Sequence, residues 1–275
     1  MALVIQTNVA SLEAQRNLFK SQSALQQTFN KLSSGYRINT AKDDAAGLAI
    51  SDSLKSQVKT LTVNERNAGD AISMAQTAEG ALGEISNIVL RMRELAAQAS
   101  NGSLQSSDRD FIQTEFTNLQ AETRRIMTST KFNGKQLITS ATTSEQFQIG
   151  IQNATYDRIG ITFGGINLAS LTGTAKVSSG PGNARTSLDT IDSALFKVSQ
   201  ARARFGAMMN RFETTISNIQ SVRLNLSSAN SRIRDVDVAE EAATQSRNQV
   251  LTQAGTSVLS QANQTPQAAM SLLRG

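Results

Sequence analysis

The chain has 275 residues, of which 39% are hydrophobic and only 4% aromatic. So little bulky apolar mass suits a thin helical bundle better than a thick globular core. There is no cysteine and no histidine, which excludes a disulfide framework, a Cys/His zinc site and histidine acid–base chemistry. The 27 basic and 22 acidic residues are interleaved, so the net charge of +5 does not form the clustered surface that nucleic-acid binding needs.

Both ends of the chain are predicted to be long helices, from Leu3 to Leu32 and from Val236 to Leu273. Each carries an apolar stripe only about two residues in seven wide, which is typical of a coiled-coil seam and not of a helix docked on a globular core. Such helices need each other, or other copies of the chain, to bury their stripes, so the pattern indicates an assembly subunit. The predicted assembly interface comprises Ile5, Val9, Leu12, Leu18, Leu25, Phe29, Leu32, Val250, Leu251, Ala254, Val258, Leu259, Leu272 and Leu273.

The region after the first helix is predicted to be an irregular connector, because residues 36–56 lack a clear period. From Val58 to Ala99 the apolar stripe then steps by alternating threes and fours, through Glu65 and Ile72 and with one slip after Ala75. This spacing predicts a single helix of about 60 Å.

A second inner helix is expected to start near Ser106-Ser107-Asp108, which offers an N-cap, and to end at Phe132-Asn133-Gly134. Apolar and polar residues then alternate on both sides of a short polar loop, which predicts a β-hairpin near 145–163. Residues 169–186 are rich in Ser, Thr, Gly and Ala and are predicted to be a linker or the stub of a larger insertion. A third inner helix is expected from Leu188 to Ala229.

These elements predict a mainly α fold, an elongated antiparallel helical bundle or coiled-coil rod with a small β-hairpin. Outer helices at both ends of the sequence flank inner helices, so antiparallel pairing of the two halves brings the N- and C-termini together. No stretch approaches a membrane span, and no basic segment precedes an apolar run. The chain is therefore expected to stay in the cytosol or to leave by a route without a cleaved signal.

Long ordered strings of residues resemble the bacterial flagellin family over nearly the whole chain. At the front they are Thr7-Asn8, Ala14-Gln15-Arg16-Asn17-Leu18, Leu32-Ser33-Ser34-Gly35, Arg37-Ile38-Asn39, Ala41–Ser51 and Ala75–Leu82. At the back they are Asn210-Arg211-Phe212-Glu213, Gln253–Leu259 and Ser271-Leu272-Leu273-Arg274. The departures are Tyr36, where the family usually has Leu, the variant stretch Arg234–Asp237, and a short middle region where the family often carries large variable domains.

The resemblance implies a subunit that polymerises into the flagellar filament, is exported unfolded through the flagellar type III apparatus, and is added at the distal tip. It implies a secreted homopolymer of the extracellular flagellum, with an export chaperone, the filament cap and hook-junction proteins as partners. No cofactor, nucleic acid or membrane insertion is expected. The implied domains are a terminal-helix polymerisation domain (1–42 and 235–275), a connector (43–57), a helical rod domain (58–168 and 187–234) and a linker left from the variable region (169–186).

One surface patch also follows from the resemblance. Arg91, Leu95 and Glu115 match positions that form, in some flagellins, the patch bound by the animal innate immune receptor for flagellin. The alternative reading is an ordinary surface ion pair beside a contact between subunits.

A carboxylate metal site is disfavoured. The candidates lack the spacing of a calcium-binding loop, and the helix dipole explains acidic residues near a helix start. They are Asp43, Asp44, Asp235, Asp237, Glu240 and Glu241.

An enzyme is not expected, because the sequence offers neither a nucleophile beside a base, nor a metal motif, nor a glycine-rich phosphate loop. Three other functions stay open. A hook–filament junction protein shares the terminal design, a secreted coiled-coil effector or adhesin would not polymerise, and a basic rod would bind nucleic acid with a steep salt dependence. The length and wording of the inner strings favour the filament subunit.

Overall fold

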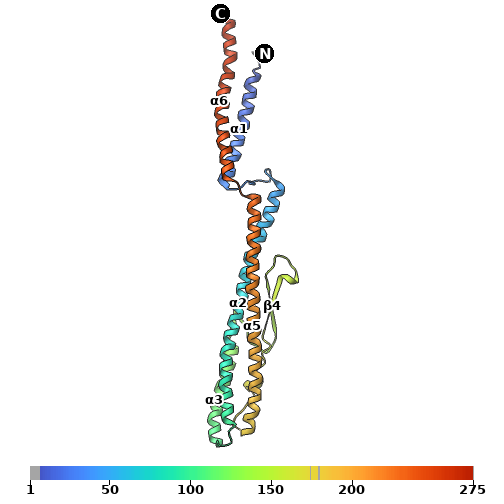
Figure 1. Cartoon of the computed structure of the whole chain (residues 1–275), viewed down its shortest axis with the longest axis vertical. Helices are drawn as coiled ribbons and strands as arrows, with labels where there is room; N and C mark the ends of the chain where they lie inside the picture. The colour runs from blue at the N-terminus through green and yellow to red at the C-terminus, as the bar shows by residue number, and fades with distance from the viewer. Residues whose placement is uncertain (1–6, 174, 179, 275) are drawn as a thin grey trace. The chain divides into compact units, whose positions relative to one another are not determined.

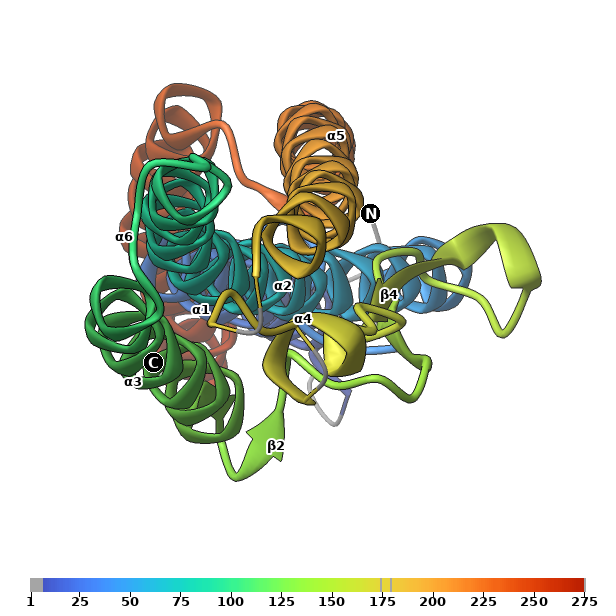
Figure 2. The same ribbon diagram turned by 90° about the horizontal axis from the view of Figure 1, so that it is seen from below.

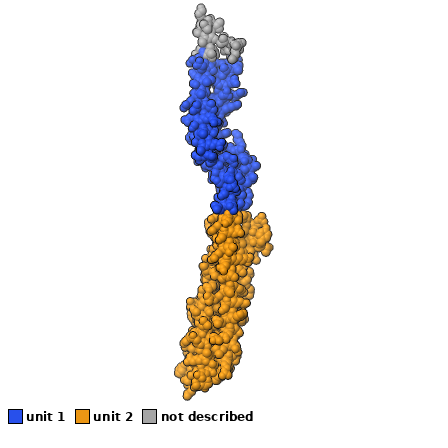
Figure 3. All heavy atoms as spheres, viewed as in Figure 1, with its two compact units in different colours: residues 1–58, 224–275 blue, residues 59–223 orange. Residues whose placement is uncertain are grey.

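The computed structural model describes residues 7–173, 175–178 and 180–274, except for the side chains of residues 265–274. It confirms a mainly α fold with long helices and two small antiparallel strand pairs. The chain divides into two compact units, coloured separately in Figure 3. Unit 1 comprises residues 1–58 and 224–275, and unit 2 comprises residues 59–223.

Unit 1 pairs the two ends of the chain. Helices α1 (Val9–Ser34) and α6 (Val238–Arg274) lie side by side and antiparallel (Figure 1). Asn8 starts α1 because its Oδ1 accepts a hydrogen bond from the Ser11 N–H at 3.1 Å. Gly35 ends the helix in the left-handed conformation at φ 74°, a conformation that other residues adopt only with strain.

The predicted irregular connector is shorter than expected, because helix α2 (Ala45–Ala99) already begins at Ala45. Asp44 caps this helix, with its Oδ1 accepting a hydrogen bond from the Gly47 N–H at 2.9 Å. Alanines follow directly, and they favour helix over the irregular conformation. The cap and the alanines thus start the helix at Ala45, although the sequence over 36–56 has no clear apolar period.

The helical core of unit 2 combines α3 (Ser106–Ser129) with the parts of α2 and α5 (Pro181–Arg234) that lie within this unit. Helices α3 and α5 pack on different sides of α2, as Figure 2 shows along the helix axes. One row of buried positions on α2 steps by threes and fours without interruption, with Met74 and Leu95 buried beside it: Leu61, Asn64, Ala68, Ala71, Ala75, Ala78, Leu82, Ile85, Val89, Met92, Ala96 and Ala99.

The predicted slip in the α2 stripe is therefore wrong. The stripe passes through Asn64 and Ala71, while Glu65 and Ile72 lie beside it and are only partly buried. Asn64 is polar and so was not counted, yet it is buried because its Nδ2 donates a hydrogen bond to Gly150 O at 2.9 Å.

The predicted hairpin is confirmed. Strand β3 (Thr143–Gln148) pairs antiparallel with β4 (Arg158–Phe163). The hairpin is held to α2 by Asn64 and by Asn67, whose Nδ2 donates to Gln148 O at 3.1 Å. Phe147 packs edge-on against Phe212 of α5 with ring centroids 5.9 Å apart, which fixes the hairpin against the second long helix.

A second strand pair replaces the expected end of α3. The helix stops at Ser129, and β1 (Lys131–Phe132) pairs with β2 (Lys135–Gln136). Asn133 and Gly134 both have positive φ, 47° and 80°, as a two-residue type I′ turn requires. The Asn-Gly dipeptide was thus a hairpin signal rather than a helix stop.

The segment predicted as a linker, 169–186, packs on the core. It contains α4 (Ala169–Gly173) and the start of α5, whose first residue Pro181 suits the first helical position. Leu171 is fully buried, and Gln120 of α3 donates its Nε2 hydrogens to Leu171 O at 2.6 Å and to Ala175 O at 3.0 Å. A side chain of α3 therefore holds the backbone of this segment in place.

Candidate assembly interface

The face on which α1 and α6 meet is poor in apolar residues. On α1 one row of buried and half-buried positions recurs by threes and fours: Ser11, Ala14, Leu18, Ser21, Leu25, Thr28 and Leu32. On α6 the matching row is Glu241, Gln245, Asn248, Thr252, Gly255, Leu259 and Ala262, and further half-buried residues such as Lys31 and Ala242 flank the two rows. We call these two sets the terminal seam. Leucines are its only bulky apolar members, so pairing the two helices gains little from apolar burial.

Polar contacts and one close approach complete the terminal seam. Asn8 Nδ2 donates to Ala262 O at 2.8 Å, and Lys31 Nζ lies 3.7 Å from Glu241 Oε1. Gly255 faces Leu18, since a Cβ built on Gly255 would lie 3.1 Å from Leu18 Cδ1. The glycine thus lets the two helices approach closely at this level.

The predicted interface residues divide between two places. Half-buried in the terminal seam are Leu18, Leu25, Leu32 and Leu259. Exposed on the other faces of α1 and α6 are Val9, Leu12, Phe29, Val250, Leu251, Ala254 and Val258. The side chains of Ile5, Leu272 and Leu273 lie outside the described residues.

Phe19 belongs with the exposed group, although it was left out of the predicted interface. It is 73% exposed and follows Leu12 by seven residues, so both occupy the same position of the coiled-coil repeat. The spacing places Phe19 on the predicted stripe of Ile5, Val9 and Leu12, although it was not counted among the interface residues. We call Phe19 and the exposed predicted residues the outer apolar residues. Several large apolar side chains left in solvent on paired helices are typical of an interaction surface.

The structure brings together two members of the predicted receptor patch. Arg91 Nε donates to Glu115 Oε1 at 3.0 Å, and Arg91 also pairs with Glu94 at 2.9 Å. Hydrogen bonds to Glu94 and Glu115 raise the pKa of Arg91 above its usual value. Leu95, by contrast, is only 3% exposed and lies in the core of unit 2.

The acidic residues near the helix starts are engaged with the backbone. Asp43 Oδ2 accepts hydrogen bonds from the backbone N–H groups of Thr40 at 2.9 Å and Asn39 at 3.1 Å, which lower the pKa of Asp43. Asp237 Oδ1 accepts from Ala239 N at 2.9 Å and so caps α6. In the part of the chain that the structure describes, no group of three or more such side chains could hold a metal ion.

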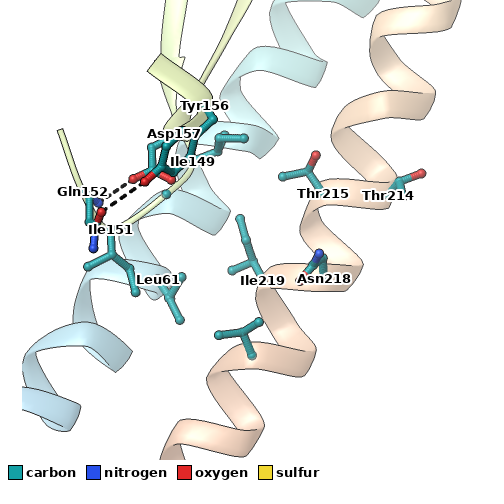
Figure 4. Close-up of a pocket in the computed structure, with 12 residues that line it drawn as sticks. Leu61, Ile149, Ile151, Gln152, Tyr156, Asp157, Thr214, Thr215, Asn218 and Ile219 are labelled. Carbon is teal, nitrogen blue, oxygen red and sulfur yellow. Dashed lines mark hydrogen bonds between the residues drawn. The ribbon is translucent and has the colours of Figure 1, made fainter. Parts of the chain in front are cut away.

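Unit 2 has an open groove of about 550 Å³ between the hairpin tip and α5 (Figure 4). Leu61 of α2 and Ile219 of α5 line it from the two long helices, and Ile151 lines it from the hairpin tip, which also carries the short 3₁₀ helix η1 (Thr155–Asp157). Asp157 Oδ2 accepts the Gln152 N–H at 2.7 Å, which ties the tip together.

Comparison with known proteins identifies the chain. Residues 5–143 match the family model of the bacterial flagellin N-terminal helical region, and residues 188–273 match that of the C-terminal helical region. A flagellin of Halalkalibacterium halodurans is 40% identical over 272 residues, which cover 99% of this chain and 100% of that protein. The chain belongs to the bacterial flagellins.

Other relatives agree. The flagellar filament 33 kDa core protein of Treponema phagedenis is 38% identical over 289 residues, 99% of this chain and 100% of that flagellar protein. A Bacillus subtilis flagellin is 39% identical over 302 residues, 98% of this chain and 99% of that flagellin. A putative flagellar hook-associated protein from Vibrio parahaemolyticus shares the fold, with a TM-score of 0.58 at 15% identity over 70% of this chain and 100% of the other.

A Bacillus cereus flagellin crystal structure matches with a TM-score of 0.49 at 34% identity, over 60% of this chain and 94% of that one. As a flagellin, the chain is a structural protein and not an enzyme. Flagellin polymerises into the flagellar filament outside the cell, and this flagellin is a subunit of such a homopolymer. None of its helices, within the residues described, is long and apolar enough to cross a bilayer.

Proposed function

We propose that the outer apolar residues of α1 and α6 form the contacts between subunits in the filament. The observation that carries this proposal is a mismatch within unit 1. Large apolar side chains such as Val250, 63% exposed, and Val258, 56% exposed, face solvent, whereas most residues of the terminal seam are small or polar. Fully burying one such side chain contributes about 1.5–3 kcal/mol, so stacked copies would gain what the lone pair lacks.

The same mismatch fits the proposed route of assembly. A chain without cysteine and with a weak terminal seam is suited to travel unfolded through the type III apparatus and to fold at the distal tip. The terminal helices would be ordered only when other copies cover them, which restrains polymerisation before export. Identical subunits in head-to-tail contacts that do not close then form a helical fibre.

The proposal assigns separate tasks to the parts of the chain. Residues 1–42 and 235–275 form the polymerisation domain, and 58–168 with 187–234 form the rod domain. Residues 43–57, most of which belong to the start of α2, connect the two along the chain. Residues 169–186 are the remnant of a variable region. An export chaperone, the filament cap and the hook-junction proteins are the proposed partners of this flagellin.

Electron microscopy of seeded, purified protein tests the proposal. The full-length chain is compared with a version that lacks residues 1–42 and 235–275. We expect filaments from the full-length chain only, because the truncated chain lacks the outer apolar residues. Filaments from both would remove the terminal helices from the interface, and discrete particles from both would remove the assembly proposal itself.

A second proposed role is recognition by the animal innate immune receptor through the exposed pair Arg91–Glu115, with Leu95 supporting it from the core. The pair is half exposed, with 52% and 47% of the two side chains accessible. Receptor binding to soluble monomer should weaken in Arg91→Ala, whereas Arg125→Ala, which alters another exposed ion pair, should leave it unchanged. Equal binding by both variants would assign Arg91 a structural role only.

A further inference from the structure

The groove of unit 2 has an apolar interior that is open to solvent. Leu61, Ile219 and Ile151 line it from α2, α5 and the hairpin tip, and its volume is about 550 Å³ (Figure 4). Ile151 is 41% exposed and Tyr156 is 77% exposed, so the tip leaves apolar surface in water. A concave apolar site of this kind suits a large apolar side chain.

A large exposed side chain lies at the other end of unit 2. Phe111, in the second turn of α3, is 77% exposed. Arg109, two residues before it, donates to Ala99 O at 3.1 Å, so the start of α3 lies beside the end of α2. At about 1.5 Å per residue, the stretch of α2 from Leu61 to Ala99 is about 57 Å long. The groove and Phe111 are therefore separated by most of the length of α2 in this unit.

The charges beside the groove and beside Phe111 are opposite. Asp110 is exposed next to Phe111 and forms no ion pair with another described residue. Arg211 precedes Thr214 and Thr215 by one helical turn, so it extends the wall that α5 gives the groove. Arg211 is also exposed and, within the described part of the chain, has no acidic partner. A carboxylate beside the ring and a guanidinium beside the groove favour contact between the two surfaces.

The other exposed phenylalanine of unit 2 fits the groove less well. Phe196 of α5 is 69% exposed, but Asp192, one turn before it, is already paired with Arg93 at 2.7 Å. Phe196 also belongs to the helix that lines the groove, whereas α3 lies on a different side of α2 (Figure 2). Phe111 and the groove can therefore face two different neighbours at once.

We propose that Phe111 of one subunit inserts into the groove of the next, with Asp110 beside Arg211. The two surfaces are different and lie far apart on unit 2, so the contact is head-to-tail, as an open helical fibre requires. The contact joins copies of unit 2 within the filament. It rests on the homopolymer that this flagellin forms, and not on the contacts proposed for the outer apolar residues of unit 1.

Cross-linking between two variants tests the contact, because the chain has no cysteine of its own. Filaments are grown from a mixture of Ser107→Cys and Asn218→Cys chains and treated with a short bismaleimide. Ser107 lies one turn before Phe111 on the same face of α3, and Asn218 lines the groove. Dimers on a denaturing gel should require both variants. Ala121→Cys, about 21 Å further along α3 than Ser107, replaces Ser107→Cys in the control and should give no dimer.

Substitutions test the side chains themselves. Phe111→Ser should raise the subunit concentration needed for filament growth at least about tenfold, because each contact loses a buried ring. Phe196→Ser removes an equally large exposed side chain and should leave that concentration unchanged. Asp110→Arg or Arg211→Glu alone should slow filament growth, and the two changes combined should restore it. Circular dichroism of the soluble chains should be the same for all these variants, because each altered side chain is exposed.

The outcomes separate this contact from the assembly proposal. Filaments of the mixture that give no dimer, or that give it as readily with Ala121→Cys, would overturn the groove contact and leave the interface of unit 1 intact. Equal effects of Phe111→Ser and Phe196→Ser, without rescue by the exchange of charges, would overturn the contact as well. Failure of the unaltered chain to form filaments would overturn both proposals.

Discussion

The terminal helix pair of unit 1 and the helical core of unit 2 share one spacing but fill it differently. In unit 2 the spaced positions are apolar, and Leu82, Ile85 and Val89 of α2 are completely buried. In unit 1 the spaced positions carry mainly small and polar residues, and large apolar residues lie outside. Spacing therefore determines which faces of two helices meet. The residues at the contact determine whether the pair is stable without further partners.

The two units also align their helices differently. Along the contact between α2 and α5 in unit 2, three ion pairs join Glu65 to Arg223, Glu79 to Arg202 and Arg93 to Asp192. The signs change between the second pair and the third, so shifted or reversed helices would bring like charges together. Bulky apolar side chains and three ion pairs align the helices of unit 2, whereas among the described residues the terminal pair has four half-buried leucines and the ion pair of Lys31 with Glu241.

The largest effect is expected from a charge placed among the outer apolar residues. Val258→Asp should abolish filament formation, because a carboxylate would be buried between subunits, yet leave unit 2 folded. Electron microscopy measures assembly, and thermal unfolding measures unit 2. Val258→Ala keeps the position apolar and should still assemble. Filaments of normal appearance from Val258→Asp would contradict the assigned interface.

A substitution in the core of unit 2 is expected to lower its stability. Leu82→Ala should lower the free energy of unfolding by about 2–5 kcal/mol, because it leaves a cavity among fully buried residues. Leu90→Ala on the same helix is the control, since Leu90 is 46% exposed and should cost no more than about 0.5 kcal/mol. Urea unfolding followed by circular dichroism measures both. Equal urea midpoints for the two variants would show that Leu82 does not lie in the buried core of unit 2.

A buried arginine of α3 caps the C-terminal end of α2 in unit 2. Arg109 is only 6% exposed, and its guanidinium donates to Ala99 O at 3.1 Å and to Asn101 O at 2.9 Å. Arg109→Met should lower the free energy of unfolding by about 1–3 kcal/mol, since it leaves these carbonyls without a donor. Hydrogen exchange in the last turn of α2 should accelerate as well. Arg124→Met, an exposed change on α3, is the control, and exchange equal in both variants would disprove the capping role.

The smallest effect is expected from pH. Arg93 hydrogen-bonds to Asp192 and lowers the pKa of this carboxyl below 3.8. A carboxyl with a lowered pKa stabilises the folded state above its ordinary pKa, and that contribution is lost as the pH falls through the lowered value. The difference in urea midpoint between the unaltered chain and Asp192→Asn should therefore shrink from about pH 5 to pH 2. A difference that stays constant over this interval would exclude the ion pair as its source.

Local signals in the sequence predicted most elements. The three-and-four spacing predicted α2, α3 and α5, and alternation predicted the hairpin of β3 and β4. These predictions succeeded because spacing and caps depend on residues close in sequence. They failed where a polar residue is buried by a distant partner. Asn64 is in the core because it donates to Gly150 O, which no local pattern shows.

One turn signal and one helix cap were present in the sequence, but each lay in a segment that was predicted to have another structure. Asn133-Gly134 forms a tight turn between β1 and β2 because both residues adopt positive φ. Asp44 caps α2 inside the segment that lacks an apolar period. In both cases the residue type allowed two structures, and the chain on either side selected one.

The candidate interface shows the same division. The sequence marked an apolar stripe on each terminal helix, but it could not divide that stripe between the contact within the chain and the contact between chains. Leu18 lies in the terminal seam while Val258 remains outside, and the choice rests on which residues of α6 face α1.

The sequence alone predicted the helical character, the pairing of the termini and the family, because each follows from composition, spacing or long strings of residues. The tertiary structure was needed to show which apolar side chains are buried within the chain and which stay exposed for contact with other copies. It also joined Tyr36 to Arg234 and Asn64 to Gly150. Burial and register are properties of residues far apart in sequence, so they are decided when the two ends of the chain meet.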